Sequence, residues 1–501
     1  MSPASFPFRT SGHGASASGP APAPVSRGAV LFVVSVSMIL MPLMMSAVGV
    51  SLPAIGRDLA ATAMQVGLVE TTYVMALSVF LLIMGRLGDI FGRRRLFLAG
   101  LVLFTSITAV LSLSQSIRMV IGLRFLQGMG AAMIVANSFA IMLEVFPREE
   151  RGRAIGIVSA AAYAGISCGP LIGGFLTTHF GWRWVFLMVL PFGISALLLV
   201  FTKLRGEWRS ARGEPFDLRG SLVYGGAIVL LTLGSSHLDE GAWAWAALGG
   251  GLACGGLFLW LEAHTPFPLL EVTLLSRNRL FTLSCLSALI NYSSTFGVLF
   301  FLGLYLQYVR GLTPSDAGLL MIIQPVIQMV LSPIGGRLAD HFPAERVATV
   351  GMLLCAVGLG VAAFIGQDTS TALTVVVLVL LGVGYGLFAS PNASAIVGSV
   401  EPRHLGVASG MTSTMRTLGM MASMIVVTIV FSVFMGGQPV SAATLPGFLA
   451  SMRTALWTFC ALCAVGVLLS VGRVRSMGQG SGLAVQDGIA DKAPCKTDGN
   501  P

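Results

Sequence analysis

The stretch that decides the fold is Gly85-Arg86-Leu87-Gly88-Asp89-Ile90-Phe91-Gly92-Arg93-Arg94-Arg95, which closes an apolar run and ends in three consecutive arginines. Its first five positions recur 251 residues later as Gly336-Arg337-Leu338-Ala339-Asp340, again at the end of an apolar run. The segment Gly128-Met129-Gly130 recurs as Gly382-Val383-Gly384, at a displacement of 254 residues. These spacings predict a chain built from two related halves.

The composition predicts that most of the chain lies in a membrane. Of 501 residues, 55% are hydrophobic and only 10% are charged, whereas soluble domains carry about 25% charged residues. A helix needs about 20 apolar residues to cross the hydrocarbon layer, where loose backbone has no hydrogen-bond partner. Runs of this kind number fourteen: 28–52, 65–87, 96–115, 118–143, 154–178, 184–203, 219–237, 242–263, 280–307, 315–335, 347–366, 371–397, 405–435 and 453–473.

The positions of the basic residues predict the orientation of these helices, because cytoplasmic loops carry an excess of Lys and Arg. With the N-terminus inside, the cytoplasmic segments hold 23 of the 30 Lys and Arg residues and the outer segments hold five. The other two, Arg124 and Arg416, fall inside apolar runs. Both termini are therefore expected in the cytoplasm of a multi-pass cell-membrane protein. The net charge of +9 reflects this orientation rather than nucleic-acid binding.

The repeat divides an all-α membrane protein into two six-helix bundles with two helices inserted between them. We expect the bundles at 28–203 and 280–473, and a linker with the two extra helices at 204–279. Residues 1–27, rich in Ser, Ala, Pro and Gly, and the polar tail 474–501 are expected to be disordered. Parallel repeats of this kind are typical of transporters that bind substrate between the halves, near mid-membrane.

The segment 85–95 has the properties of a conformational gate. Its glycines allow two helices to meet at a tight turn, and Asp89 can pair with Arg93 and face helix N-termini of the other half. Contacts that form in one conformation and break in another set the balance between states. A basic topology anchor would explain the arginines but not the Gly-x-x-Gly-Asp-x-x-Gly spacing. The residues expected in the gate are Gly85, Gly88, Asp89, Gly92, Arg93 and Asp340.

This spacing resembles the cytoplasmic loop signature of the major facilitator superfamily, and the likeness covers most of residues 28–473. The segment 216–220, Phe-Asp-Leu-Arg-Gly, is similar to the 14-helix drug:proton antiporter branch of that family. The resemblance implies the major facilitator fold.

The fifth apolar run contains Gly165-Ile166-Ser167-Cys168-Gly169-Pro170-Leu171-Ile172-Gly173-Gly174, which resembles the antiporter signature of the same family. Glycines four residues apart make a flat face for close helix packing, and Pro170 removes a helix hydrogen bond and permits a bend. The resemblance implies a flexible, leak-tight seam between the halves, typical of exporters. A general glycine packing face is the alternative interpretation. The residues of this motif are Gly165, Gly169, Pro170, Gly173 and Gly174.

Two charged residues inside apolar runs are candidates for proton coupling. Arg124 lies in a stretch that resembles the family's fourth-helix motif, where the arginine is associated with proton coupling; the alternative is that it only bonds carbonyl groups. The branch usually has an aspartate in the first run, but the matching position is Met44. Glu70 is the acidic side chain clearly inside the apolar layer of the first half. Because a carboxyl group removed from water can cycle a proton near neutral pH, we hypothesise that Glu70 replaces this aspartate; an interfacial glutamate is the alternative.

The polar residues of the other runs are candidates for the wall of a substrate cavity. Arg416 is predicted to face the cavity near Asn392 or Asn137, where it can attract anionic substrates. Cation exporters generally need buried carboxylates, which are few here, so neutral or anionic hydrophobic compounds are favoured. Each amide or hydroxyl can instead bond a neighbouring helix. The candidates are Asn137, Tyr163, Asn291, Tyr292, Gln324, Gln328, Asn392 and Arg416.

The expected function is proton-coupled efflux of hydrophobic drug-like compounds by alternating access. The alternative is a proton-coupled exporter or symporter of one endogenous metabolite. The sequence has no phosphate-binding loop for ATP, and its six histidines and seven cysteines are not grouped at metal-ligand spacing. We therefore expect no enzymatic activity, no cofactor and no metal. The expected partners are a small-molecule substrate, protons and the lipid bilayer, and the resemblance implies a monomer.

Overall fold

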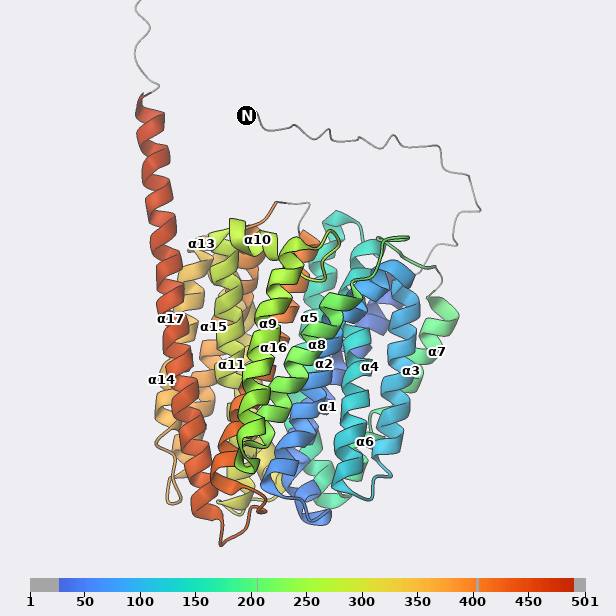
Figure 1. The fold of residues 1–501 in the computed structure, drawn as a ribbon, viewed down its shortest axis with the longest axis vertical. Coiled ribbons are helices and arrows are strands. Elements are labelled where there is room, and N and C mark those ends of the chain that lie inside the picture. The colour runs from blue at the N-terminus through green and yellow to red at the C-terminus, as the bar shows by residue number, and fades with distance from the viewer. Residues whose placement is uncertain (1–26, 205, 402–404, 491–501) are drawn as a thin grey trace, which may run out of the picture.

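The computed structural model describes residues 27–204, 206–401 and 405–490, which form a bundle of long helices (Figure 1). Within these residues, 14 helical segments are long and apolar enough to cross a membrane. Each of them overlaps one predicted apolar run, so the predicted number and order of spans is confirmed.

The first half contains seven helices that make six spans. The sixth span is divided between α6 and α7 next to Pro191, because a proline has no N–H to continue the helical hydrogen bonds. The helices are α1 (Arg27–Asp58), α2 (Ala63–Phe91), α3 (Arg93–Leu111), α4 (Ile117–Val145), α5 (Arg148–His179), α6 (Arg183–Leu187) and α7 (Leu190–Lys203).

The remaining helices form the inserted segment and the second half. The tenth span is divided between α12 and α13, just before Pro325. The inserted segment comprises α8 (Leu218–Ser236), the 3₁₀ helix η1 (Leu238–Glu240), α9 (Ala242–His264) and α10 (Val272–Arg277). The second half comprises α11 (Arg279–Tyr308), α12 (Pro314–Met321), α13 (Ile323–His341), α14 (Ala344–Ala362), α15 (Thr371–Gly398), α16 (Leu405–Met435) and α17 (Leu445–Ala490).

The sequence repeat is also a repeat of helix contacts. In the first half a Cβ atom added to Gly100 would lie 3.0 Å from the carbonyl oxygen of Gly130, where α3 crosses α4. In the second half a Cβ atom added to Gly351 would lie 2.7 Å from the carbonyl oxygen of Gly384, where α14 crosses α15. The displacements between these positions are 251 and 254 residues, as between the repeated motifs. Small residues thus let equivalent helix pairs approach closely in both halves.

The inserted helices α8 and α9 contact both halves. The hydroxyl group of Tyr224 in α8 donates a hydrogen bond to the carbonyl oxygen of Ser78 in α2, at 2.9 Å. On the other side, Thr428 of α16 donates to the hydroxyl oxygen of Ser235, at 2.8 Å. The insertion therefore covers the line along which α2 and α16 meet, as α8 does in front of the bundle in Figure 1.

The C-terminal helix differs from the prediction. It continues to Ala490 and projects beyond the bundle in Figure 1, although the stretch from 474 onward is predicted to lack structure. Adding residues to an existing helix costs much less than nucleating a new one, so a polar continuation remains helical. Residues 1–26 and 491–501 lie outside the described residues, and the predicted domain boundaries stay predictions.

The two halves are hydrogen-bonded to each other at one end of the bundle. This end lies opposite the 85–95 segment, and we call it the closed end. There the side chain of Gln307 in α11 donates to the carbonyl oxygen of Val50 in α1, at 2.8 Å. The backbone N–H of Ser315 in α12 donates to the hydroxyl oxygen of Thr178 in α5, at 3.0 Å. Polar groups thus pair directly across the interface between the halves.

Glycine is required at this closed end. A Cβ atom at Gly174 would collide with the carbonyl oxygen of Pro314, and one at Gly318 would collide with the carbonyl oxygen of Pro170. Because these neighbours are backbone atoms, they cannot rotate away.

We therefore predict that Gly174→Ala opens the closed end. Overpacking of about 1–3 kcal/mol shifts a two-state equilibrium by about tenfold, so a thiol reagent should label a cysteine placed at Ser315 about tenfold faster. The matched control is Gly156→Ala in the same helix, where a Cβ atom meets nothing within 4 Å. Equal labelling rates in the two variants would contradict the prediction.

Candidate functional site

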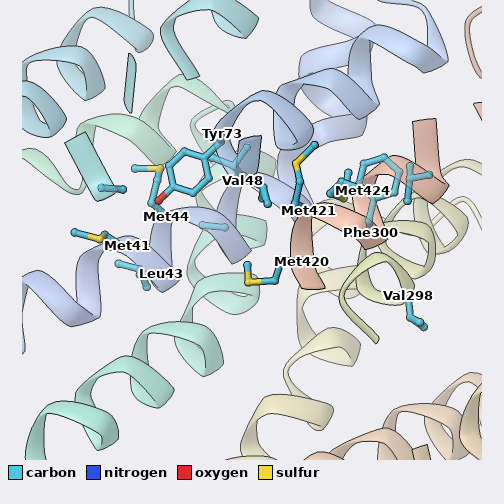
Figure 2. Close-up of a cluster of buried hydrophobic side chains, with 14 of the residues drawn as sticks. Met41, Leu43, Met44, Val48, Tyr73, Val298, Phe300, Met420, Met421 and Met424 are labelled. Atoms are coloured by element: carbon cyan, nitrogen blue, oxygen red, sulfur yellow. The ribbon is translucent and has the colours of Figure 1, made fainter. Parts of the chain in front are cut away.

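A cavity of about 280 Å³ lies between the two halves. Its wall comes from α1, α2, α4 and α5 of the first half and from α11, α12, α13, α15 and α16 of the second. The wall is mostly apolar, and Figure 2 shows Met41 and Tyr73 on one side and Met420, Met424 and Phe300 on the other. The cavity therefore lies where the repeat predicts a substrate site.

The divided tenth span supplies polar groups to this wall. Pro325 has no N–H, so the helix cannot bond normally to the carbonyl group of Met321 one turn earlier. Irregular backbone at this depth is tolerated where it lines a cavity. Met321, Pro325 and the two glutamines Gln324 and Gln328 all line the cavity.

The charged centre of the site is a buried ion pair between α4 and α2. Nη2 of Arg124 lies 3.1 Å from Oε2 of Glu70, and the two side chains are 0% and 5% exposed. The guanidinium group also donates from Nε to the carbonyl oxygen of Val69, at 3.2 Å, and from Nη1 to Oε1 of Gln127, at 2.7 Å. The cation is therefore satisfied on three sides. Arg124 bonds a carbonyl group, as one sequence interpretation expects, and also an acid; its role in proton coupling stays a prediction.

A second layer of groups holds the arginine in place. The guanidinium carbon lies 4.1 Å from the centre of the Tyr73 ring, within the range of a cation–π interaction. Gln127 in turn donates to the hydroxyl oxygen of Thr108 in α3, at 2.8 Å. The ion pair is thus fixed by side chains from three helices.

Glu70 connects the ion pair to the cavity. Its Oε2 faces Arg124, whereas its Oε1 is buried and has no hydrogen-bond partner among the described residues. Both Glu70 and Tyr73 belong to the cavity wall. A carboxyl oxygen in this setting can accept a proton or a hydrogen bond from a bound molecule. The residue is only 4% exposed, so it is enclosed by neighbouring helices.

The ion pair belongs to the first half alone. The repeat displacements of 251 and 254 residues place Met321 at the position equivalent to Glu70, and Leu378 at the position equivalent to Arg124. Met44, where the related branch has an aspartate, is fully buried in the hydrophobic cluster of Figure 2. Two halves with equivalent packing therefore differ in charge.

Beyond the cavity, the predicted gate is an ionic cluster at the end of α2. Arg93 forms an ion pair with Asp89, at 2.7 Å, and a second with Glu144 of α4, at 3.1 Å. The structure therefore pairs Asp89 with Arg93, as the spacing predicts.

The surroundings of Asp89 also include a segment that the prediction did not name. Among the described residues, the segment 206–217 lies against Asp89: Ala211 N–H donates to the carbonyl oxygen of Asp89, at 3.1 Å. Glu214 of the same segment pairs with Arg86, at 2.6 Å. The carboxylates of this segment are attracted by the cluster of arginines that follows α2.

Two of the gate glycines have a specific steric role. Gly92 has a φ of 123°, which other residues rarely adopt, and a Cβ atom there would collide with the side chain of Glu207. A Cβ atom at Gly88 would collide with the amide oxygen of Asn137 in α4. Gly85 makes only an ordinary contact, 3.8 Å from Ala136.

Asp340, the equivalent of Asp89 in the second half, is arranged differently. It is exposed, and within the part of the chain that the structure describes it makes no ion pair. Among the described residues, the aspartate of the first repeat is thus ion-paired and that of the second repeat is not.

The glycines of the 165–174 motif divide into two groups. Gly165, Gly169 and Gly173 pack against α1 within the first half, against Ile39, Ser46 and Ala47 respectively. Gly174 and Pro170 instead contact α12 of the second half. Only Pro170 and Gly174 therefore lie at the interface between the halves. The other three glycines form a general packing face within the first half.

Comparison with known proteins identifies the family. The sequence model described as Major Facilitator Superfamily matches residues 34–424.

The chain belongs to the Major Facilitator Superfamily.

Several relatives are transporters. The chain is 29% identical over 454 residues to the riboflavin transporter RibZ of Clostridioides difficile. The aligned region covers 89% of this chain and 97% of RibZ. It is 31% identical over 398 residues to the tetracenomycin C resistance and export protein of Streptomyces glaucescens, covering 78% of this chain and 73% of that protein. The crystal structure of a bacterial homologue of the human lysosomal transporter Spinster has the same fold, with a TM-score of 0.64 at 16% identity, covering 90% and 97% of the two chains. This Major Facilitator Superfamily protein is thus a multi-pass membrane transporter of small molecules.

The predicted cavity residues fall into two groups in this transporter. Those on the cavity wall are Tyr163, Tyr292, Gln324, Gln328 and Arg416. Asn137, Asn291 and Asn392 are buried and do not line the cavity, which corrects their predicted place on its wall.

Two of these asparagines bond backbone carbonyl groups, the alternative that the sequence left open. Asn392 donates to Ser284 of the neighbouring helix α11, at 3.2 Å. Asn137 donates to Met84 of α2, at 3.5 Å, and to Met133 of its own helix, at 2.8 Å. Because an amide buried between helices must find a partner, such bonds hold it away from the cavity.

The sequence analysis overlooked part of the cavity wall and of the gate. Tyr73 lies one turn after Glu70 on the same helix face, and Met38, Met41 and Met45 follow helical spacing along α1. That periodicity was a usable signal. Glu214 is paired with Arg86 across 128 residues of sequence, and no local pattern indicates such a contact.

We predict that the two repeats of the gate differ in importance. The Asp89–Arg93 pair is partly exposed, at 30% and 14%, so Asp89→Asn should change unfolding stability by less than about 1 kcal/mol. If the ion pair exists in one conformation only, its removal changes the free-energy difference between the conformations by up to about 1 kcal/mol. The transport rate should then fall by up to about fivefold. The measurement is the initial rate of dye transport in proteoliposomes, with the thermal unfolding midpoint as folding control. Asp340→Asn is the matched control and should transport normally; an equal loss in both variants would contradict the asymmetry.

Proposed function

We propose that this transporter is a proton-coupled exporter of hydrophobic drug-like compounds that works by alternating access. The observation that carries this proposal is Glu70, a residue of the cavity wall whose Oε2 is paired with Arg124 and whose Oε1 is buried without a hydrogen-bond partner among the described residues. One group is therefore in contact with both the ion pair and the substrate space.

The coupling follows from the charges of the pair. When Glu70 is ionised it compensates the buried guanidinium group of Arg124. A proton on Glu70 removes that compensation, and Arg124 keeps its bonds to Val69 and Gln127 and its contact with the Tyr73 ring but has no anion. Because a cation without an anion is costly at this depth, the protonated protein favours an arrangement of α2 and α4 different from that of the ionised protein.

The direction of transport is proposed from the distribution of charge. The positive-inside rule predicts that the 85–95 end faces the cytoplasm, and the bonds at the closed end then separate the cavity from the outside. A substrate would enter from the cytoplasm in this conformation and leave after the closed end opens. Similarity to an antibiotic export protein supports the same direction.

A second candidate is transport of one endogenous metabolite. It is favoured by the similarity to a riboflavin transporter across 97% of that protein's length. An efflux screen in a host that lacks its own pumps separates the two candidates. Resistance to several unrelated compounds, abolished by a protonophore, supports the first, whereas movement of a single metabolite and no change for any drug supports the second.

Glu70→Gln tests the proton-coupling role. Glutamine keeps the size and hydrogen-bonding ability of the side chain but cannot cycle a proton, so transport driven by an imposed pH gradient should fall by at least about fivefold, the low end of typical coupling energies. Dye movement in proteoliposomes with and without the gradient measures this. The control is Glu150→Gln, which removes a half-exposed carboxylate paired with Arg27 at the surface. Full gradient-driven transport by a well-folded Glu70→Gln protein would refute the proposal.

A further inference from the structure

The cavity contains an arginine without a compensating acid. Arg416 lies within α16 and belongs to the cavity wall, where Glu70 is the other charged side chain. Glu70 is already paired with Arg124. Across the residues that the structure describes, Arg416 has neither an ion pair nor a hydrogen bond, and its side chain is exposed to the cavity.

An uncompensated cation at this depth indicates the charge of the ligand. A charged side chain inside a membrane protein is unfavourable unless water or an opposite charge compensates it. A guanidinium group offers two parallel N–H donors, which match the two oxygens of a carboxylate or sulfonate. A bound anion would therefore supply what Arg416 lacks.

The neighbours of Arg416 indicate the shape of the ligand. Tyr292 packs against α16, where a Cβ atom added to Gly419 would lie 2.7 Å from the Tyr292 Cβ. Its ring centre is 6.1 Å from that of Tyr385, and both tyrosines line the cavity. Met420 and Met424 follow Arg416 at intervals of four residues, so the three lie on one face of α16. Methionine sulfur and tyrosine rings both make favourable contacts with aromatic rings.

We propose that the preferred substrates are flat aromatic anions, whose acid group binds Arg416 while the ring system lies against Tyr292, Met420 and Met424. This inference rests on the proposed transport function and specifies its substrate class. A flat aromatic cation is disfavoured at the same place, because Arg416 repels it and the nearest acid of the wall is already bonded to Arg124.

Binding of two dyes with the same ring system tests the inference. Fluorescein carries negative charge at neutral pH, whereas rhodamine methyl ester carries positive charge on a similar three-ring frame. Fluorescence polarisation with the purified full-length protein, without a pH gradient, should show at least about tenfold tighter binding of fluorescein. Arg416→Gln should remove this preference, and Arg416→Lys should retain part of it because lysine keeps the charge but not the paired donors.

Matched variants keep the result interpretable. Arg453→Gln removes an exposed arginine of α17 away from the cavity and should bind fluorescein like the wild type. Size-exclusion elution at the wild-type volume shows that each variant is folded, and Arg416→Lys carries the test should Arg416→Gln aggregate.

Three outcomes would overturn the inference: tighter binding of the rhodamine ester by the wild type, no binding of fluorescein, or unchanged fluorescein binding by Arg416→Gln. Proton-driven transport of the rhodamine ester without any preference for fluorescein would overturn this inference and leave the proposed function intact. Preference for fluorescein without any effect of a pH gradient on transport would support this inference and overturn the proposed proton coupling.

Discussion

One buried ion pair, Arg124 with Glu70, determines how the first half of this transporter is arranged. A cation inside a membrane helix must be compensated, and Arg124 is compensated by an acid and a carbonyl oxygen of α2 and by Gln127 of its own helix. The two helices can come close enough for these bonds because Gly128 faces the carbonyl oxygen of Tyr73, where a Cβ atom would collide. Glycine packing and the ion pair thus depend on each other.

The helix that carries Glu70, α2, connects the ion pair to the second half, to the cavity and to the 85–95 segment. α2 is unbroken over 29 residues. Near its start Gly67 lies against Phe431 of α16, one to two turns later Glu70 and Tyr73 line the cavity, and at its end Asp89 is paired with Arg93. A change in the charge of Glu70 therefore acts on a rigid element that contacts the second half, the substrate space and the gate. The proposed coupling needs no other connection.

Much of the fold was predictable from the sequence because the signals are local. Hydropathy gave fourteen spans, and the recurrence of the 85–89 motif at 336–340 gave the two halves, because lipid and close helix packing restrict residue types at each position. Membership of the cavity wall was not predictable. Arg416 lines the cavity whereas Asn137 and Asn392 bond neighbouring backbone, and an amide at a helical position satisfies either role. The contact of the 206–217 segment with the gate depends on tertiary folding alone.

The central claim is that the charge state of Glu70 sets the balance between closed and open arrangements of the two halves. The most direct measurement is the distance distribution between spin labels at positions 178 and 315, which are bonded across the closed end, in wild-type protein at low and high pH and in Glu70→Gln. The account predicts two populations whose ratio changes with pH in the wild type, and a single pH-independent distribution in Glu70→Gln that matches the wild type at low pH. A pH-dependent shift of the same size in Glu70→Gln would contradict it.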